Sequence, residues 1–282
     1  MTESQNANLA EIKDLSVSFM TDAGSIKAVD RINFTIPRKT VVGVVGESGS
    51  GKSVTARSII KLLPETATTS GAVYLSKRDG SDSLDVLSLS GEQLREVRGS
   101  EAAMVFQEPN SVLNPVYTIG WQIEEGLRAH GMKDKKELRA KAIDILKKVG
   151  IPDAETRVDY YPHQFSGGQK QRIVIAMALV LNPGLILADE PTTALDSITQ
   201  RQIVDLLTSL VDGAGASLLF ITHDFSVLAR ATSRCYVLDA GRIVESGNTA
   251  DLLAVPKTVE ARRLVSAARN LTLHAGIGKG VR

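Results

Sequence analysis

Four short runs of the chain are apolar at nearly every position, and each is about as long as a β-strand. Strands that are buried on both faces of a sheet read in this way, because neither face meets water. Such strands form mostly parallel sheets covered by helices, so the sequence predicts an α/β fold. The predicted strands are VVGVV (41–45), AAMVF (102–106), LILA (185–188) and SLLFI (217–221).

Two other regions alternate between apolar and polar residues, as strands do when one face of a sheet meets water. They cover residues 10–37 and 72–87 and contain the segments INFTI and AVYL. A third segment, YVLDAGRIVESG (236–247), has the pattern of a hairpin that turns at Ala240 and Gly241. The sequence therefore predicts antiparallel strands beside the parallel sheet.

A long stretch between the second and third apolar runs has the period of α-helices. In KKELRAKAIDILKKVG one apolar stripe repeats at helical spacing, and Gly150 follows where a helix cap is expected. The stripe consists of Leu138, Ala142, Ile145, Leu146 and Val149. This pattern predicts a helical subdomain of about residues 108–182, inserted into the parallel-sheet domain.

The C-terminal stretch has a different composition from the rest of the chain. From about Val255 it is helical in pattern and basic, and it ends in the glycine-rich IGKGVR, which we expect to be loose. We therefore expect one domain over residues 1–255, followed by a tail over residues 256–282. The chain has 282 residues, 43% of them hydrophobic, which suffices for a core of that size.

Charge and cysteine content exclude several classes of protein. The 33 basic and 32 acidic residues nearly cancel, so no nucleic-acid partner is expected. The single cysteine, Cys235, excludes an internal disulfide and a cysteine-based zinc site, and is interpreted as a small buried residue.

The N-terminal segment lacks the pattern of a signal peptide. The longest apolar run, Ile173–Leu181, has nine residues, whereas a spanning helix needs about 20. We expect a cytosolic protein that reaches a membrane only through a partner.

The segment GESGSGKS (46–53) has the spacing of a phosphate-binding P-loop and follows a predicted strand, as that loop requires. Its glycines let backbone N–H groups approach phosphate oxygens, its lysine reaches the terminal phosphates, and its last serine is a ligand for Mg²⁺. The predicted ATP-binding residues are Gly46, Glu47, Ser48, Gly49, Ser50, Gly51, Lys52 and Ser53. GTPases and small-molecule kinases also use P-loops, but SKRD (76–79) is interpreted as a charged hairpin loop rather than a guanine-reading motif.

Two acids end the third apolar run. Asp189 is placed to hold Mg²⁺, and Glu190 is placed to polarise a water for attack on the γ-phosphate, beside the catalytic Lys52. His223 follows the fourth run, at the edge of a parallel sheet where ligands bind. An acidic pair alone could merely cap the next helix. Together with a P-loop, it indicates nucleotide hydrolysis.

The segment FSGGQKQR (165–172) resembles the signature of ATP-binding-cassette (ABC) ATPases. The family's other motifs stand in the expected order, which is the P-loop, Gln107, the signature, LILADE, TALD (193–196) and His223. The resemblance covers about residues 10–255. It implies a P-loop NTPase (RecA-like) core built on a parallel sheet, with an antiparallel β subdomain and an inserted α-helical subdomain.

The resemblance also implies roles for individual residues. In this family two cassettes pack head to tail, and each ATP lies between one P-loop and the partner's signature. The γ-phosphate held by the other subunit would be bound by Ser166, Gly167, Gly168 and Gln169. Gln107 would contact Mg²⁺ or the attacking water, and His223 would contact the γ-phosphate. Asp196 would contact the opposite subunit. Phe19 matches the position where an aromatic ring stacks on adenine, with a core phenylalanine as the alternative.

Within the ABC family, FQEPNSVLNPVYTIGWQI (106–123) and ADEPTTALD (188–196) resemble the peptide and nickel importer branch. Peptide-type members often end in a longer, cysteine-containing tail, which VPKTVEARRLVSAARN does not match. The branch implies two transmembrane permease subunits, a second ABC ATPase subunit and, indirectly, an extracytoplasmic solute-binding protein. The second ATPase is a different paralogue or another copy of this chain. The location implied is the cytoplasmic face of the inner (plasma) membrane, and the residues do not distinguish a dipeptide, oligopeptide, nickel or metallophore as cargo.

Two other functions are compatible with a P-loop. An ABC-type ATPase could act on DNA or ribosomes instead of in transport, but chromosome-type members insert a long coiled coil between the P-loop and the acidic pair. Here the gap is 189 − 52 = 137 residues, without sustained heptads. Ribosome-type members carry two cassettes, whereas this chain has one P-loop. A GTPase or metabolite kinase would leave SGGQ (166–169) and Gln107 unexplained.

Overall fold

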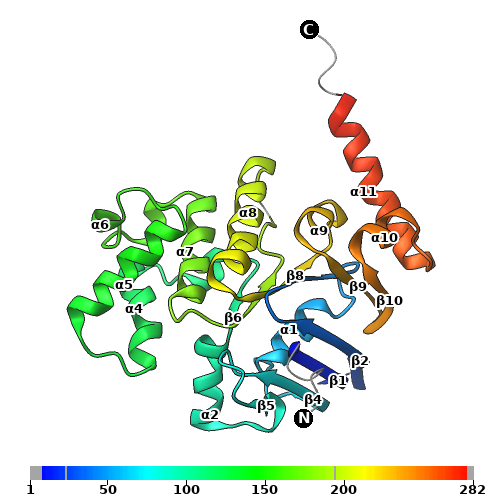
Figure 1. Cartoon of the computed structure of the whole chain (residues 1–282), viewed down its shortest axis with the longest axis horizontal. Helices are drawn as coiled ribbons and strands as arrows, with labels where there is room; N and C mark the ends of the chain where they lie inside the picture. Colours follow the sequence, from blue (N-terminus) through cyan, green and yellow to red (C-terminus); the bar gives the residue numbers. More distant parts are fainter. Residues whose placement is uncertain (1–7, 23, 194, 278–282) are drawn as a thin grey trace.

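The computed structural model describes residues 8–22, 24–193 and 195–277. A six-stranded sheet in the order β10-β9-β3-β8-β7-β6 forms the centre of the molecule (Figure 1). The strands β3, β6, β7, β8 and β9 are parallel where they pair, and β10 is antiparallel to β9. The bounds are β3 (Val41–Val45), β6 (Ala102–Val105), β7 (Leu185–Asp189), β8 (Ser217–Thr222), β9 (Arg234–Asp239) and β10 (Arg242–Asn248).

All four predicted buried strands are confirmed. Residues Ala102–Val105 and Leu185–Asp189 are buried at every position, as are Ser217–Thr222. The strand predicted for 102–106 ends one residue early, because Phe106 leaves the sheet for the loop that carries Gln107. The predicted parallel-sheet α/β fold is therefore correct.

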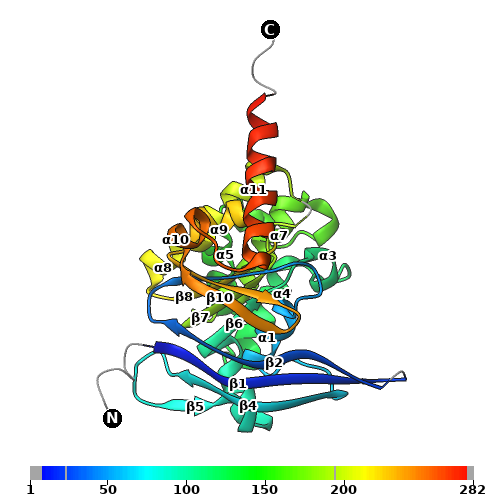
Figure 2. The same cartoon turned by 90° about the vertical axis from the view of Figure 1, so that its right-hand side faces the viewer.

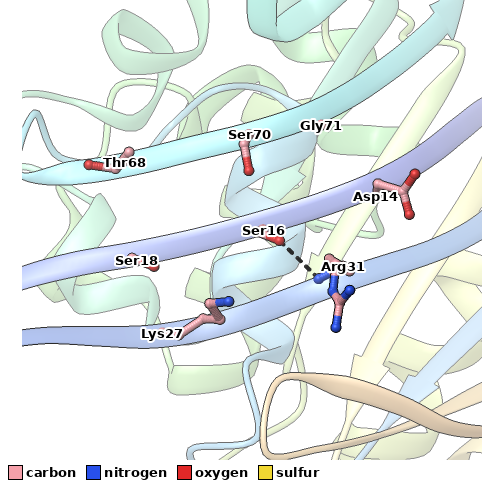
Figure 3. Close-up of a pocket in the computed structure, with 8 residues that line it drawn as sticks. All are labelled: Asp14, Ser16, Ser18, Lys27, Arg31, Thr68, Ser70 and Gly71. Atoms are coloured by element: carbon pink, nitrogen blue, oxygen red, sulfur yellow. Dashed lines mark hydrogen bonds between the residues drawn. The ribbon is translucent and has the colours of Figure 1, made fainter.

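A second sheet of four antiparallel strands, in the order β2-β1-β4-β5, lies beside the first (Figure 2). Its strands are β1 (Asn8–Thr21), β2 (Gly24–Pro37), β4 (Ala67–Ser76) and β5 (Ser83–Asp85). One face buries apolar side chains such as Leu15 and Val17, and the other face is polar. Figure 3 shows serines and threonines from β1 and β4 on that outer face, beside Lys27 and Arg31 of β2.

The antiparallel strands predicted over 10–37 and 72–87 are confirmed, although β4 begins at Ala67. The segment ATTS has no apolar alternation, because two of its residues point to the polar outer face, so periodicity does not reveal it. Gly71 has φ +94°, and an added Cβ would lie 2.5 Å from the Asp14 carbonyl oxygen. Only glycine lets β4 approach the irregular stretch of β1 so closely.

The predicted hairpin is formed by β9 and β10. Ala240 and Gly241 both have positive φ, 43° and 77°, as the two-residue turn of a type I′ hairpin requires. The turn contacts β2, because the Asp30 N–H donates to the Gly241 carbonyl at 2.8 Å. Cys235 of β9 is fully buried, as predicted, and burial raises the pKa of its thiol.

The chain between β6 and β7 is helical. Its elements are α3 (Pro109–Val112), α4 (Ile119–Ala129), α5 (Lys135–Lys148), α6 (Ala154–Arg157), the 3₁₀ turn η4 (Pro162–Gln164) and α7 (Gly167–Leu179). The apolar stripe predicted on α5 is buried at all five positions. Gly150 has φ +78°, and the Ile151 N–H donates to the Leu146 carbonyl, which ends the helix as predicted. Figure 1 shows these helices together at one end of the central sheet.

The remaining helices cover the sheets. They are α1 (Lys52–Ile59), η2 (Val86–Ser88), α2 (Gly91–Glu96), the π-type turn η3 (Val97–Glu101), α8 (Ser197–Ala214), α9 (Phe225–Ala231), α10 (Thr249–Ala254) and α11 (Val259–Ile277). Helix α11 begins against α9 and β9, where Ala261 and Val265 are buried, and then projects from the body (Figures 1 and 2). The last residues of the predicted loose tail, 278–282, lie outside the described residues.

Candidate functional site

The P-loop joins the end of β3 to the start of α1. Gly49 and Gly51 have φ values of +82° and +103°, which a residue with a Cβ rarely adopts. An added Cβ on Gly51 would lie 2.5 Å from the Ala28 carbonyl oxygen, and one on Gly46 would lie 2.1 Å from the Leu238 carbonyl oxygen. No side chain caps the first turn of α1, so its backbone N–H groups are available to an anion.

Lys52 is buried within this loop, with only 4% of its surface exposed. Its Nζ donates to the carbonyl oxygens of Gly46 at 2.9 Å and of Glu47 at 2.8 Å, and it lies 3.9 Å from Glu190 Oε1. Burial lowers the pKa of the Lys52 ammonium, and the nearby Glu190 carboxylate opposes that change. The loop therefore holds a poorly solvated cation where phosphates are expected.

Ser53 and Asp189, both predicted as metal ligands, are in direct contact. The Ser53 hydroxyl donates to Asp189 Oδ1 at 2.7 Å. Burial raises the pKa of the Asp189 carboxyl, although the bond from Ser53 acts in the opposite direction. Among the described residues no group of three or more histidines, cysteines or acids could hold a metal alone. A cation here would take further ligands from nucleotide and water oxygens.

Glu190 lies at the centre of a second cluster, at the carboxyl ends of β7 and β8. Its Oε2 accepts from Gln107 Nε2 at 3.4 Å and lies 3.1 Å from His223 Nδ1. The Thr193 hydroxyl donates to the same oxygen at 3.0 Å. The structure thus brings together the four residues predicted as catalytic, since Lys52 approaches the other oxygen of Glu190.

Thr193 contacts Glu190, although its sequence position had not indicated a role in the site. It lies three residues after Glu190, at the start of the TALD segment, so its spacing is the signal that could have indicated it. Glu190 has φ +46°, and its N–H donates to the Ile221 carbonyl at 3.0 Å. A non-glycine residue in this conformation is uncommon, and such residues concentrate at functional sites.

The predicted signature starts helix α7. The Gln169 N–H donates to the Ser166 hydroxyl at 3.3 Å, and the Ser166 N–H donates to Gln169 Oε1 at 3.1 Å, which forms a capping box. Gly167 is open, because an added Cβ would meet nothing within 4 Å. Within the described part of the chain, Ser166 and Gln169 make no hydrogen bond to residues 46–53. The P-loop and the signature are thus separate sites in one chain.

Asp196 caps helix α8 beside the signature. Its carboxylate accepts from the backbone of Ile198 and Thr199, each at 3.0 Å, and from the Thr199 hydroxyl at 2.6 Å. Thr199 in turn contacts the signature, since an added Cβ on Gly168 would lie 2.6 Å from its Cγ2. Asp196 and the signature therefore form one continuous surface.

Two further contacts connect distant segments to the site. Gln171 of α7 is buried and donates from Nε2 to the Phe106 carbonyl at 3.4 Å, which links the signature helix to the residue before Gln107. Arg263 of α11 lies 3.7 Å from Glu47 of the P-loop. Both contacts depend on tertiary folding, and the sequence pattern gives no sign of either.

Phe19 is neither fully buried in the core nor fully exposed. It lies half-buried on β1, opposite Ile26 of β2 and Ala67 of β4, and packs against the apolar cluster under the antiparallel sheet. Phe19 therefore contacts the hydrophobic core under the antiparallel sheet. Its stacking on adenine stays a prediction.

Replacing Asp189 by asparagine is expected to stabilise the nucleotide-free protein by about 1 kcal/mol at pH 7. The raised pKa of Asp189 means that the folded state disfavours its ionised form. As pH rises through the pKa of the folded state, ionisation of this carboxyl therefore lowers the free energy of unfolding of the wild type. The gain in the variant should therefore shrink towards low pH, where the acid is neutral in both states. Urea unfolding at pH 7 and at pH 4.5 measures the difference, and equal stabilities at pH 7 would contradict it.

The site has the parts that nucleotide hydrolysis requires. A buried lysine lies in a glycine-rich loop, a serine and an aspartate present oxygens side by side, and a glutamate contacts a glutamine and a histidine. On a parallel sheet with helices on both faces, this arrangement defines a P-loop NTPase.

Comparison with known proteins shows which family of P-loop proteins the chain belongs to. The family profile described as ABC transporter matches residues 29–193. A protein of Brucella abortus (strain 2308) named putative peptide import ATP-binding protein is 45% identical over 267 residues, which is 95% of this chain and 79% of the relative. The dipeptide transport ATP-binding protein DppD of Haemophilus influenzae is 44% identical over 88% of this chain and 74% of the relative. The chain belongs to the ABC transporter family.

Solved structures agree with this assignment. A dimeric post-hydrolysis state of the ATP-binding cassette MJ0796, bound to ADP and Pi, is similar at a TM-score of 0.73 and 32% identity. The similarity covers 85% of this chain and 98% of that one. The cbiO1 protein of Clostridium perfringens, part of an ABC transporter complex, gives a TM-score of 0.71 at 28% identity over 88% of this chain and 91% of that one.

The family assignment settles the general activity. The chain is an ATP-binding and ATP-hydrolysing subunit of the ABC type, and ATP is its nucleotide. Membership also implies work with membrane permeases. No helix of the described residues is long and apolar enough to cross a membrane. The names of the relatives above describe import, so they give no support to the alternative function on DNA or ribosomes.

Proposed function

We propose that this chain powers the uptake of peptides, nickel or a related small solute through two separate permease subunits. The cluster around Glu190, which Gln107, His223 and Lys52 all approach, supports ATP hydrolysis, and the names of the relatives support its use for uptake. The names of the relatives favour peptides over nickel as cargo. The domain expected over residues 1–255, with its helical subdomain at about 108–182, would be the motor, and residues 256–282 would be an appended tail.

The P-loop residues 46–53 would hold the phosphates of ATP. The fit is supported by the uncapped start of α1 and by Gly49, around which an added Cβ would meet open space. Ser50 Oγ is a buried hydroxyl without a hydrogen-bond partner among the described residues, as expected in a loop built to receive another polar group. Lys52 would exchange its bonds to the Gly46 and Glu47 carbonyls for phosphate oxygens.

Ser53 and Asp189 would hold Mg²⁺, with Gln107 at its edge. Their adjacent oxygens suit a hard cation that completes its shell with phosphate and water. When bound, the cation supplies charge neutralisation at the β- and γ-phosphates. Burial raises the pKa of Asp189 in this structure, and a bound cation would favour its ionised form.

Glu190 would act as the general base for the attacking water. The carboxylate is partly buried, and contacts from Thr193, Gln107 and His223 fix its orientation. His223 is more than half exposed, so it can leave Glu190 and contact the γ-phosphate of a bound nucleotide. Gln107 would help to position the water and would report the state of the site to the permease.

The signature would complete the site of a partner cassette. Ser166, Gly167 and Gln169 start a helix whose first N–H groups suit the γ-phosphate of an ATP held by the other subunit. Asp196 would touch the same partner, since it shares the surface through Thr199. The partner would be a second ABC ATPase, either a different paralogue or another copy of this chain.

Replacing Gly167 by alanine separates the folding of the signature from its action on a partner. The added methyl meets no atom of this chain, and alanine is a better helix former than glycine, so the free energy of unfolding should stay within about 0.5 kcal/mol of wild type or rise. ATP hydrolysis by the assembled transporter should fall by about 10-fold or more, because the methyl would stand where the partner's phosphate approaches. Paired unfolding and ATPase assays measure both effects, and full activity would contradict the proposed role.

The permease would dock on the helical region, at the cytoplasmic face of the inner (plasma) membrane. Tyr117 and Trp121 stack with ring centroids 4.0 Å apart and stay about 40% exposed, and Val116 beside them is 69% exposed. Exposed aromatic residues that cluster in this way are typical of protein interfaces. An extracytoplasmic solute-binding protein would deliver the cargo to the other side of the permeases.

Co-purification and reconstitution test the proposed function. The tagged chain, solubilised from membranes, should bring two permease subunits with it. ATP hydrolysis by the reconstituted complex should rise when the solute-binding protein is loaded with a peptide, or with nickel if that is the cargo. Recovery of ribosomes or DNA in place of permeases would support the alternative function.

A further inference from the structure

The first turns of helix α11 are attached to the body of the molecule beside β9 and β10 (Figure 1). The Glu245 carboxylate of β10 accepts from the Lys257 N–H at 3.0 Å, and from the N–H and the hydroxyl of Thr258, each at 2.8 Å. Ala261 and Val265 are buried in the same apolar cluster as β9. The backbone of α11 between these two residues, which carries Arg263, therefore has a defined position.

The P-loop contacts the same end of β9. The Gly241 N–H donates to the Ser50 carbonyl at 3.0 Å, and an added Cβ on Gly46 would lie 2.1 Å from the Leu238 carbonyl oxygen. Leu238 also lines a cavity of about 60 Å³ that has Glu47 of the P-loop on one side and α11 on the other. Helix α11 and the phosphate-binding loop are thus neighbours, although more than 200 residues separate them in sequence.

The charged side chains around this small cavity are mostly acidic. Glu47, Asp239 and Glu260 line it, and Arg263 is the only cation among the described residues that do so. A guanidinium nitrogen of Arg263 lies 3.7 Å from Glu47 Oε1, and the two side chains are 69% and 56% exposed. Exposed ion pairs of this length add little to the stability of a fold. Any consequence of this pair is therefore to be sought in the P-loop.

Glu47 belongs to the phosphate cradle through its backbone. Its carbonyl oxygen accepts from Lys52 Nζ at 2.8 Å and from the Ser50 N–H at 3.2 Å. A carboxylate on this residue is therefore well within the Debye length, about 10 Å at 0.1 M salt, of phosphates bound by the loop. Because like charges repel, the orientation of the Glu47 side chain matters for the binding of ATP.

We propose that Arg263 is a positioning residue for the ATP site, which holds the Glu47 carboxylate against α11 and away from the phosphates. Asp239 and Glu260 repel Glu47 from the same space, so without the arginine the carboxylate would turn towards the mouth of the P-loop. Helix α11 would in this way raise the affinity for ATP without touching the nucleotide. The inference rests on the proposed role of residues 46–53 as the phosphate-binding loop.

Equilibrium binding of ATP to the full chain tests the proposal. Arg263→Gln should raise the Kd by about 5-fold, the effect of one uncompensated charge a few ångströms from a phosphate in water. Arg263→Lys keeps the charge and should stay within about 2-fold of wild type. Arg262→Gln is the matched control, because Arg262 is exposed on the same helix, contacts the Lys257 carbonyl and does not line the cavity.

Two further measurements separate positioning from a structural role. The unfolding midpoint of Arg263→Gln should equal that of the wild type, because the pair is exposed. In ATP hydrolysis by the assembled transporter, the same variant should raise KM by about 5-fold and leave kcat within about 2-fold, because the arginine acts on binding and not on the reacting atoms.

A double-mutant cycle tests whether Arg263 acts through Glu47. Glu47→Gln removes the repelling charge, so it should bind ATP at least as tightly as the wild type. In that background Arg263→Gln should have no further effect, since no carboxylate is left to hold. An equal loss of affinity with and without the Glu47 charge would overturn the proposal and assign Arg263 a direct attraction to the phosphates.

Other results would also overturn the proposal. They are a Kd within about 2-fold of wild type in Arg263→Gln, a loss in Arg263→Lys as large as in Arg263→Gln, or a lowered unfolding midpoint that accounts for the weaker binding. Each of these leaves the proposed ATP site intact, provided that the wild type binds ATP. A folded wild-type chain that binds no ATP would instead contradict the P-loop assignment, and this inference with it.

Discussion

Replacing Glu190 by glutamine is expected to slow ATP hydrolysis by about 10²- to 10⁴-fold while ATP binding persists. Glutamine keeps the shape of the side chain and can still contact Gln107, Thr193 and His223, but its amide cannot take a proton from water. The loss should therefore appear in kcat rather than in the affinity for ATP.

Single-turnover hydrolysis and equilibrium binding of ATP measure the two effects of Glu190→Gln separately. Glu92→Gln makes the same chemical change on the exposed face of α2 and should behave as wild type. Hydrolysis within a few-fold of wild type in Glu190→Gln would remove Glu190 from the role of base and direct attention to His223.

Replacing Lys52 by alanine is expected to raise the Kd for ATP by about 100-fold, which corresponds to the loss of charge-assisted bonds to the phosphates. The fold should survive, because burial already disfavours the Lys52 ammonium, as its lowered pKa indicates. Its bonds in the free protein go to two carbonyl oxygens of its own loop.

A fluorescent ATP analogue measures the affinity of Lys52→Ala, and thermal unfolding checks its fold. Lys136→Ala, on the exposed face of α5, is the control for removal of a lysine. Micromolar binding retained by a folded Lys52→Ala variant would contradict the assignment of residues 46–53 as the phosphate cradle.

The elements that the sequence predicted best are those with a strong local pattern. The four buried strands stand out because a parallel sheet leaves no polar face, so their runs contain no interruption. The hairpin turn and the end of α5 were predictable because Gly241 and Gly150 adopt positive φ. Residues 67–70 of β4 were not predicted as strand because Ala67 is their only apolar residue, so no apolar alternation is visible.

The site was predictable from spacing only where its residues belong to one segment. Lys52 and Ser53, or Asp189 and Glu190, are adjacent in sequence, and the strand order then brings the two pairs together. Thr193 was overlooked because a threonine has many local uses. The contacts of Arg263 with Glu47 and of Gln171 with Phe106 join segments 216 and 65 residues apart, and no local pattern encodes them.

The signature starts a helix that its own P-loop does not use, because Ser166 and Gln169 bond to each other and, among the described residues, not to residues 46–53. We propose that this helix start binds the nucleotide held by a second cassette. A variant that binds ATP without hydrolysing it would hold the two cassettes together, because the γ-phosphate that both contact would persist.

The most direct test is the mass in solution of Glu190→Gln by light scattering, with and without ATP and magnesium, while bound nucleotide is monitored. The chain should change from its 30.2 kDa monomer to about twice that mass when ATP is added. Adding Ser166→Arg to the same variant should keep ATP bound but prevent the dimer. A dimer that Ser166→Arg leaves intact would contradict the claim that the signature of one cassette completes the P-loop site of the other. An ATP-loaded Glu190→Gln chain that stays monomeric would leave a different paralogue as the partner.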